Sequence, residues 1–358
     1  MEKKKPRIGF RIAMIAIIAV LLVFLTVGNY LATVVYYTSI NNVFSVTAQG
    51  ETSEGITTNE GRFALGQQII GEGVTLLSNN GVLPLTGKSI KVNLLGQRAY
   101  DPVYGGTGSG SGDSSSAITL MQALNENGFE VNPAVDKAGV YKSAGKSDDG
   151  AGMGFSESEL ELKDPDLSKY TGEASFESMK EFSDIAILVF GRAGGEGNDL
   201  TSFVSQDGRH YLQLSVNEEA LVKKASETFG TVIVLFNGAN TLELGFVETY
   251  DVDAALWIGD PGISGFPAVA QILNGTINPS GRLVDTFAYD ATSAPSWQNF
   301  GNATFANSPV IVAEGFSGTT EEVFHYVDYV EGIYVGYRWY ETAAEEGFID
   351  YDKTVQYG

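Results

Sequence analysis

From residue 61 onward, the sequence alternates between short apolar runs and stretches with helical spacing. Four runs rich in Val, Ile, Leu, Phe and Ala predict buried strands: residues 90–95, 185–190, 231–236 and 254–258. Four segments carry apolar residues three or four positions apart and predict helices: residues 62–79, 117–127, 217–229 and 262–275. Near-continuous apolar strands separated by helices indicate a mainly parallel sheet that is covered on both faces. The pattern therefore predicts an α/β fold.

The N-terminal region has a different pattern. Residues 1–11 hold five basic side chains and one acidic side chain, and no charged residue follows between Ile12 and Gly50. Residues 12–28 are almost wholly aliphatic, and the apolar stretch reaches the roughly 20 residues of a membrane span if it extends to residue 35. We predict a transmembrane anchor, with the basic flank in the cytoplasm and the rest of the chain outside the cell. The alternative is a cleaved signal peptide, whose apolar core is usually shorter.

The predicted organisation has four parts. Residues 1–37 form the basic stub and the anchor, residues 38–60 form a polar linker, and residues 61–290 form the sheet domain. Residues 291–358 extend that domain and hold seven aromatic residues between Phe324 and Tyr340, with Tyr and Val alternating. Alternation is typical of strands, so we expect this tail to pack on the sheet domain as an aromatic-rich β segment rather than as a platform for ligand stacking.

Composition narrows the possible chemistry. The chain has 358 residues, 43% of them hydrophobic, which is incompatible with a disordered protein. The net charge is −22, of which residues 1–11 contribute +4 and the remainder −26, so no basic surface for nucleic acid is expected. The absence of Cys excludes disulfides, thiol nucleophiles and Cys-ligated zinc. With only His210 and His325 available, we predict no metal site and no cofactor, and chemistry that uses mainly carboxylates.

Three motifs for nucleotides or nucleophiles are only superficially present. Residues 87–89 read Gly-Lys-Ser, but a P-loop would have Gly where Val82 stands and would follow a strand rather than precede one. Residues 104–112 are rich in glycine and Glu130 could bind a ribose, yet the spacing differs from that of a dinucleotide loop. The Gly-Ser-Gly-Ser-Gly of residues 108–112 lacks the strand–turn–helix context of a nucleophilic serine.

The loop after the predicted strand 185–190 is more informative. It places Glu196 between two glycines, Gly195 and Gly197. Ligands of parallel sheets gather beyond the carboxyl ends of the strands, and glycines allow close approach to a ligand. A carboxylate in this place could act as a general acid, although a glutamate between glycines is more often a solvated loop residue. Spacing alone leaves both interpretations open.

Six segments in a fixed order carry a family resemblance. They are residues 71–85, 104–110, 195–199, 259–262, 278–287 and 331–338. Together they resemble the C-terminal, sandwich-type domain of glycoside hydrolase family 3, the β-glucosidase and β-xylosidase family. The match covers nearly the whole region after residue 61, and the number of independent segments makes it specific.

The resemblance implies a three-layer αβα sandwich and a retaining β-glycosidase that acts on β-linked oligosaccharides or glycosides without a cofactor. By position in the Gly-Glu-Gly loop, Glu196 is the expected general acid/base. Retaining chemistry needs a second carboxylate roughly 5 Å away, and the family supplies it as an Asp from a (β/α)8 barrel. Thr107 and Asp199 lie where family members bind substrate. Thr107 stands where some members have an aromatic residue, and Asp199 is followed by Leu200 where many have Arg.

The sequence contains neither the nucleophile motif nor room for a barrel. We therefore expect a membrane-anchored glycosidase in which the barrel follows residue 358 or joins as a separate chain, and in which this chain alone is inactive. In the alternative, the chain is a tethered domain that binds sugar or a partner without catalysis. Either way the expected location is the cell membrane, with a single span and an extracellular domain.

Overall fold

The protein is described from a computed structural model. It describes residues 8–31, 36, 58–106, 114–141, 162, 164–194, 200, 208–299, 303–315 and 318–358, with side chains for all of these except 8–13, 298–299 and 311–322. The chain divides into two compact units, Met1–Arg62 and Phe63–Gly358.

The first unit contains helix α1 (Ile8–Tyr30). The sequence predicts a membrane-spanning helix at this place. Among the described residues, however, no helix combines the length and the apolar character that a span requires. The expected transmembrane helix is therefore not found.

The remaining helices and strands are short. The helices are α3 (Asn59–Gly73), α4 (Gln97–Tyr100), α5 (Leu120–Glu126), α6 (Ala134–Lys137), α8 (Phe176–Phe182), α9 (Val216–Thr228), α10 (Phe246–Thr249), α11 (Phe266–Leu273), α12 (Tyr337–Glu345) and α13 (Tyr351–Thr354). The strands are β1 (Thr75–Asn79), β2 (Ile90–Leu95), β3 (Phe129–Val131), β4 (Ile185–Gly191), β5 (Thr231–Asn237), β6 (Ala254–Trp257), β7 (Phe287–Ala288), β8 (Ile311–Gly315), β9 (Gly318–Glu322) and β10 (Val355–Tyr357).

Six strands form the main sheet in the order β1-β6-β5-β4-β2-β3. All neighbours run parallel except β1, which pairs antiparallel with β6 at the edge. The central pair β4 and β5 stays in register from Ile185 opposite Thr231 to Gly191 opposite Asn237. The four predicted strands are thus confirmed within one or two residues, and the fold is α/β with a mainly parallel sheet.

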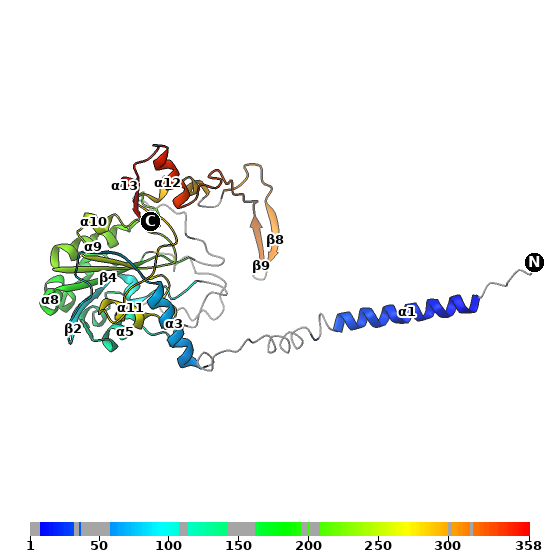
Figure 1. Ribbon diagram of the computed structural model, residues 1–358, viewed down its shortest axis with the longest axis horizontal. Coiled ribbons are helices and arrows are strands. Elements are labelled where there is room, and N and C mark those ends of the chain that lie inside the picture. The colour runs from blue at the N-terminus through cyan, green and yellow to red at the C-terminus, as the bar shows by residue number, and fades with distance from the viewer. Residues whose placement is uncertain are drawn as a thin grey trace, which may run out of the picture. The chain divides into compact units, whose positions relative to one another are not determined.

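Successive side chains of the central strands enter two separate cores. Leu188 and Phe190 of β4 pack in a cluster with residues of α8, α9 and α10. Ile187 and Val189 of the same strand point to the opposite face, where they pack with residues of α5 and α11. Figure 1 shows these two groups of helices on either side of the sheet. Because both faces are buried, the strands are apolar throughout, which is the feature that made them visible in the sequence.

The predicted helix 62–79 is wrong in its second half. Helix α3 ends at Gly73, and Thr75–Asn79 form strand β1. The apolar spacing continues across this boundary, but Gly71 and Gly73 weaken the last helical turn because glycine costs about 1 kcal/mol relative to alanine in a helix. The free edge of β6 then pairs with residues 75–79, so the partner strand decides the conformation.

The C-terminal tail also differs from its prediction. Strand β10 pairs with β7, and Tyr340 and Val355 are buried, so this part does pack on the domain. The aromatic stretch before α12 is not a β segment in the core. Tyr329 is 74% exposed and Ile333 70% exposed, and the only β contact made by the described residues 323–336 is an isolated bridge between Thr304 and His325. Strand-like alternation buries one face only where another element covers that face, and among the described residues the segment around Phe305, whose ring packs on Tyr326, covers this stretch only in part.

Candidate active site

The two glycine-rich loops leave the sheet from neighbouring parallel strands. Strand β2 pairs with β4, so the loops after Leu95 and after Gly191 begin side by side at the carboxyl edge. This is the edge where the sequence places the chemistry. The candidate residues Glu196, Asp199 and Thr107 all lie outside the described residues, and their roles stay predictions. The structure does describe the segments from which these loops depart.

Close backbone packing at this edge requires glycine. A side chain at Gly191 would start 2.2 Å from the carbonyl oxygen of Asn237, and one at Gly96 would start 2.3 Å from that of Val189. Asn237 is fully buried, and its side chain accepts a hydrogen bond from the N–H of Val103 and donates to the carbonyl oxygens of Val103 and Gly259. One amide thus fixes the loops after β2 and β6 to the end of β5.

Arg192 anchors the loop that carries Glu196. The residue is 1% exposed, and its guanidinium makes a bidentate ion pair with Glu218 of α9, with both N–O distances at 2.9 Å. Its other three hydrogen bonds go to the carbonyl oxygens of Gly191, Tyr211 and Gln213. Every one of the five guanidinium N–H groups is therefore used. Arg192 ties the start of the loop to the segment by which the chain returns.

The returning segment is fixed by the helix that follows. Ser215 caps α9 in a capping box, in which the Ser215 hydroxyl accepts from the N–H of Glu218 and the Glu218 carboxylate accepts from the N–H of Ser215. Arg209 makes a second ion pair, with Glu219, at 2.6 Å on a partly exposed surface. The residues on both sides of the loop are thus held to the same helix.

Two carboxyl groups lie at this edge of the sheet: Asp164 is buried beside Gln97, and Asp260, which follows β6, is half-buried. Burial raises the pKa of Asp260 to about 6, while the charge of Arg98 acts to lower it. The Oδ1 atom of Asp260 is buried and has no hydrogen-bond partner among the described residues. Burial and the charge of Glu218 raise the pKa of Asp164, whose carboxylate accepts a hydrogen bond from the N–H of Gln97. The positions of Asp164 and Asp260 indicate a structural role, because neither carboxylate lies on an exposed loop.

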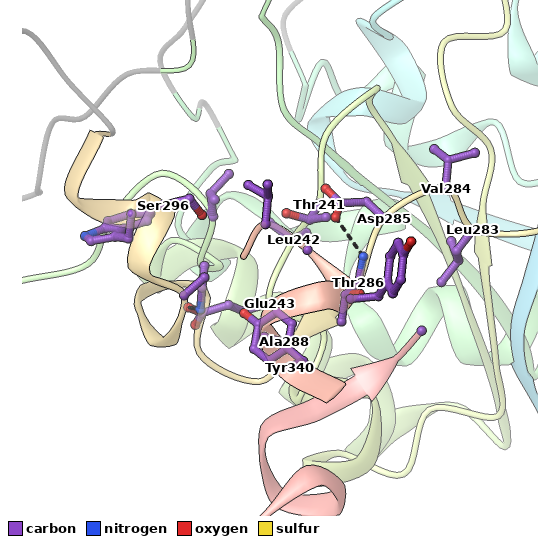
Figure 2. Close-up of a pocket in the computed structure, with 18 of the residues that line it drawn as sticks. Thr241, Leu242, Glu243, Leu283, Val284, Asp285, Thr286, Ala288, Ser296 and Tyr340 are labelled. Atoms are coloured by element: carbon purple, nitrogen blue, oxygen red, sulfur yellow. Dashed lines mark hydrogen bonds between the residues drawn. The ribbon is translucent and has the colours of Figure 1, made fainter. Parts of the chain in front are cut away.

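The ends of the Glu196 segment approach each other at the rim of a cavity. A side chain at Gly194 would start 2.9 Å from the Leu200 side chain, and Leu200 lines a cavity of about 700 Å³. Figure 2 shows Glu243, Asp285 and Tyr340 around this space. Trp297 and Glu341 also line it. Aromatic rings together with carboxylates are a suitable lining for a polar ligand with apolar faces, such as a sugar.

One cluster was missed at the sequence level. His210, Glu243 and Asp290 each offer a ligand atom, and these atoms all lie within 4.8 Å of one another. Glu243 belongs to the cavity lining as well. The sequence shows two isolated His residues and gives no metal spacing, so only the folded chain brings these groups together.

Comparison with known proteins gives a consistent result. The sequence profile of the glycosyl hydrolase family 3 C-terminal domain matches residues 74–337. Beta-glucosidase of Ruminococcus albus is 32% identical over 285 residues, which cover 78% of this chain and 26% of that protein. Beta-glucosidase A of Butyrivibrio fibrisolvens is 30% identical over 315 residues, which cover 82% of this chain and 34% of that protein.

The fold agrees with a solved structure. Beta-glucosidase 3B from Thermotoga neapolitana in complex with glucose matches with a TM-score of 0.58 at 27% identity, over 80% of this chain and 36% of that chain. The chain therefore spans only about a quarter to a third of the length of the curated relatives that it matches.

Proposed function

The chain belongs to glycosyl hydrolase family 3 through its C-terminal domain, and from this premise we propose that it is one part of a retaining β-glycosidase. In this proposal Glu196 is the general acid/base. The observation that carries it is the construction of the loop base, where Arg192 is fixed by its ion pair with Glu218 and Gly194 and Leu200 lie too close together for a side chain at position 194. With the base of the loop fixed in this way, the glycine-flanked Glu196 can present its carboxylate to a substrate.

The nucleophile is proposed to come from a (β/α)8 barrel domain, in cis or in trans. A retaining mechanism needs two carboxyl groups roughly 5 Å apart. Of the described carboxylates at this edge, Asp164 is buried and Asp260 is half-buried, so neither is presented to a substrate on an exposed surface. The exposed aromatic stretch of residues 324–337 supports a further domain, since large exposed apolar patches usually mark interaction surfaces.

The proposed substrate is a β-linked oligosaccharide or glycoside. The relative from Thermotoga neapolitana is described in complex with glucose, and two relatives are beta-glucosidases by name. A sugar also suits the aromatic and acidic lining of the cavity. The cavity equally supports a second candidate function, in which the domain binds sugar without catalysing its hydrolysis.

Hydrolysis of p-nitrophenyl β-glucoside separates these functions. The chain alone should give no turnover, because the nucleophile is absent. A chimera in which residues 63–358 replace the matching segment of the Ruminococcus albus enzyme should be active. Glu196→Ala in that chimera should lower kcat about 10²–10⁴-fold, the usual contribution of a general acid/base, and azide should restore part of the rate.

Glu177→Ala is the matched control, because Glu177 is an exposed glutamate on α8. Unchanged kcat in the Glu196→Ala chimera would remove Glu196 from the mechanism. Turnover by the chain alone that Glu196→Ala abolishes would refute the requirement for a barrel.

We also propose, from the sequence, that the N-terminal segment addresses the domain to the outer side of the cell membrane. The charge-free residues 12–50 after a basic flank support this location. Cell fractionation with protease protection tests it: an intact chain in the membrane fraction with a protease-accessible domain indicates an anchor. A shortened chain in the medium indicates a cleaved signal, and an intact chain in the cytoplasm contradicts both.

A further inference from the structure

Three residues distant in the sequence meet where the returning end of the Glu196 loop contacts the C-terminal part of the domain. His210 precedes α9, Glu243 follows β5, and Asp290 follows β7. The Nε2 atom of His210 lies 3.1 Å from Oε1 of Glu243, and ligand atoms of all three residues lie within 4.8 Å of one another. We propose that they form a binding site for a divalent transition-metal cation of the Zn²⁺ or Mn²⁺ type.

The donor set is suited to such an ion. Zn²⁺ binds imidazole nitrogen and carboxylate oxygen at roughly 2.0–2.2 Å, which places neighbouring ligand atoms roughly 3–3.5 Å apart. The contact between His210 and Glu243 already has this separation. The mixture of one imidazole and two carboxylates favours Zn²⁺ or Mn²⁺ over Ca²⁺, which prefers oxygen ligands only. Two carboxylates also supply the negative charge that a divalent cation balances.

The imidazole of His210 is the observation that points to a ligand. It is 9% exposed, and neither ring nitrogen makes a hydrogen bond with a described residue, in spite of the short contact with Glu243. A buried polar atom without a hydrogen-bond partner destabilises the fold, so such atoms usually have a role beyond packing. A cation between His210 and the two carboxylates would use the lone pair that the protein leaves unused.

Neighbouring groups hold the proposed ligands in place. Trp297 packs on the His210 ring at 4.8 Å between ring centres. Glu243 accepts hydrogen bonds from the N–H of Ala291 at 2.7 Å and from the Gln213 amide at 2.8 Å. Asp290 Oδ1 accepts from the N–H of Thr292 at 2.8 Å. Metal ligands are commonly oriented by outer hydrogen bonds of this kind.

The site would have a structural consequence. Three protein ligands leave at least one coordination position for water, and Glu243, Ala291 and Trp297 also line the 700 Å³ cavity. A bound cation would fasten the return of the Glu196 loop to the segment after β7. It would therefore stabilise the cavity wall, whether or not the chain takes part in catalysis.

Metal binding by the full chain, without an affinity tag, tests the proposal. After dialysis against EDTA, calorimetric titration with ZnCl₂ and with MnCl₂, followed by metal analysis of the desalted protein, should give one equivalent of at least one of the two ions. The thermal unfolding midpoint should rise with the concentration of that ion. His210→Gln and Asp290→Asn should each weaken its binding at least tenfold. Asn at position 290 can still cap the following turn, so this variant should remain folded.

His325→Gln is the matched control, because His325 is the other histidine of the chain and is exposed. It should bind the metal like the parent. The proposal is overturned if neither ion binds stoichiometrically, if His210→Gln and Asp290→Asn bind as tightly as the parent, or if His325→Gln weakens binding as much as they do. If His210→Gln does not fold, the comparison between Asp290→Asn and His325→Gln decides.

Discussion

Two buried side chains, Arg192 and His210, stand at opposite ends of the same loop and differ in how many of their nitrogen atoms make hydrogen bonds with described residues. At the start of the loop, Arg192 is 1% exposed and has all five N–H groups in hydrogen bonds. At the end, His210 is 9% exposed and has neither ring nitrogen in a hydrogen bond with a described residue. Arg192 and His210 are similarly buried but differ in hydrogen bonding, which indicates that they have different roles. Arg192 and Glu218 form a closed cluster with a structural role. His210, Glu243 and Asp290 form an open cluster that can accept a ligand.

The closed cluster explains why a glycine-rich loop can be functional. A loop of glycines has little intrinsic order, so its geometry depends on what fixes its ends. Here the fixing group is an ion pair to helix α9 that also completes the helix cap at Ser215. We therefore expect changes at Arg192 to act on stability first, and through it on whatever Glu196 does.

Breaking the closed cluster should have the largest effect. Arg192→Met removes one partner of a buried ion pair and leaves Glu218 charged in the interior, which costs about 3–5 kcal/mol. Urea unfolding of the variant and the parent measures this difference. If Arg192→Met is too unstable to purify, Arg192→Lys keeps the charge and loses the bidentate geometry, and a smaller loss is expected. A loss below about 1 kcal/mol for Arg192→Met would contradict the structural role.

The double variant Arg192→Met/Glu218→Gln separates the cost of the unpaired charge from the loss of the other hydrogen bonds. Glutamine at position 218 can still complete the capping box, and it is neutral. We expect the double variant to be more stable than Arg192→Met alone, by about 1–3 kcal/mol in urea unfolding. Equal stability would show that the buried carboxylate is not the source of the loss.

Asp260 is a half-buried carboxyl group at this edge, and its Oδ1 atom has no hydrogen-bond partner among the described residues. Its pKa is about 6 in the folded protein and lower when unfolded, so the folded state binds more protons between these values. Its contribution to stability is therefore full below about pH 4 and is lost as the pH rises to about 6. Relative to Asp260→Asn, the parent should lose roughly 2–3 kcal/mol between pH 4 and pH 7.

Unfolding of both proteins across this pH range measures the difference. Arg98→Met should move the loss to higher pH, because the charge of Arg98 lowers the pKa of Asp260. Parallel curves for the parent and Asp260→Asn would mean that the carboxyl group is ionised normally in the fold.

The smallest loss of stability is expected when the partly exposed ion pair between Arg209 and Glu219 is broken. Arg209 and Glu219 form an ion pair between the same loop and the same helix, but their side chains are 33% and 36% exposed. Arg209→Met should cost about 0.2–1 kcal/mol, the usual value of a solvent-screened pair. Urea unfolding of Arg209→Met and Arg192→Met under the same conditions compares the two losses of stability directly. Equal losses would show that burial is not what distinguishes the two pairs.

The local hydrophobic pattern predicted the central strands correctly. It failed where pairing with another strand, or the lack of it, determines the conformation of a segment. The runs at 185–190 and 231–236 became β4 and β5, because a strand buried on both faces must be apolar along its whole length. Residues 75–79 have helical spacing, yet the open edge of β6 recruits them as β1. The aromatic tail alternates like a strand, but no described sheet covers Tyr329 or Tyr337.

The α/β class, the family and the loop in which a catalytic glutamate is expected could all be inferred from the amino-acid sequence, because they depend on residues close together in the chain. Only the tertiary structure brought His210, Glu243 and Asp290 within 4.8 Å of one another. Likewise, only the fold buried Arg192 against Glu218 of α9. Such contacts join segments that are distant in sequence. The order and register of the strands bring those segments together, and no local pattern encodes either.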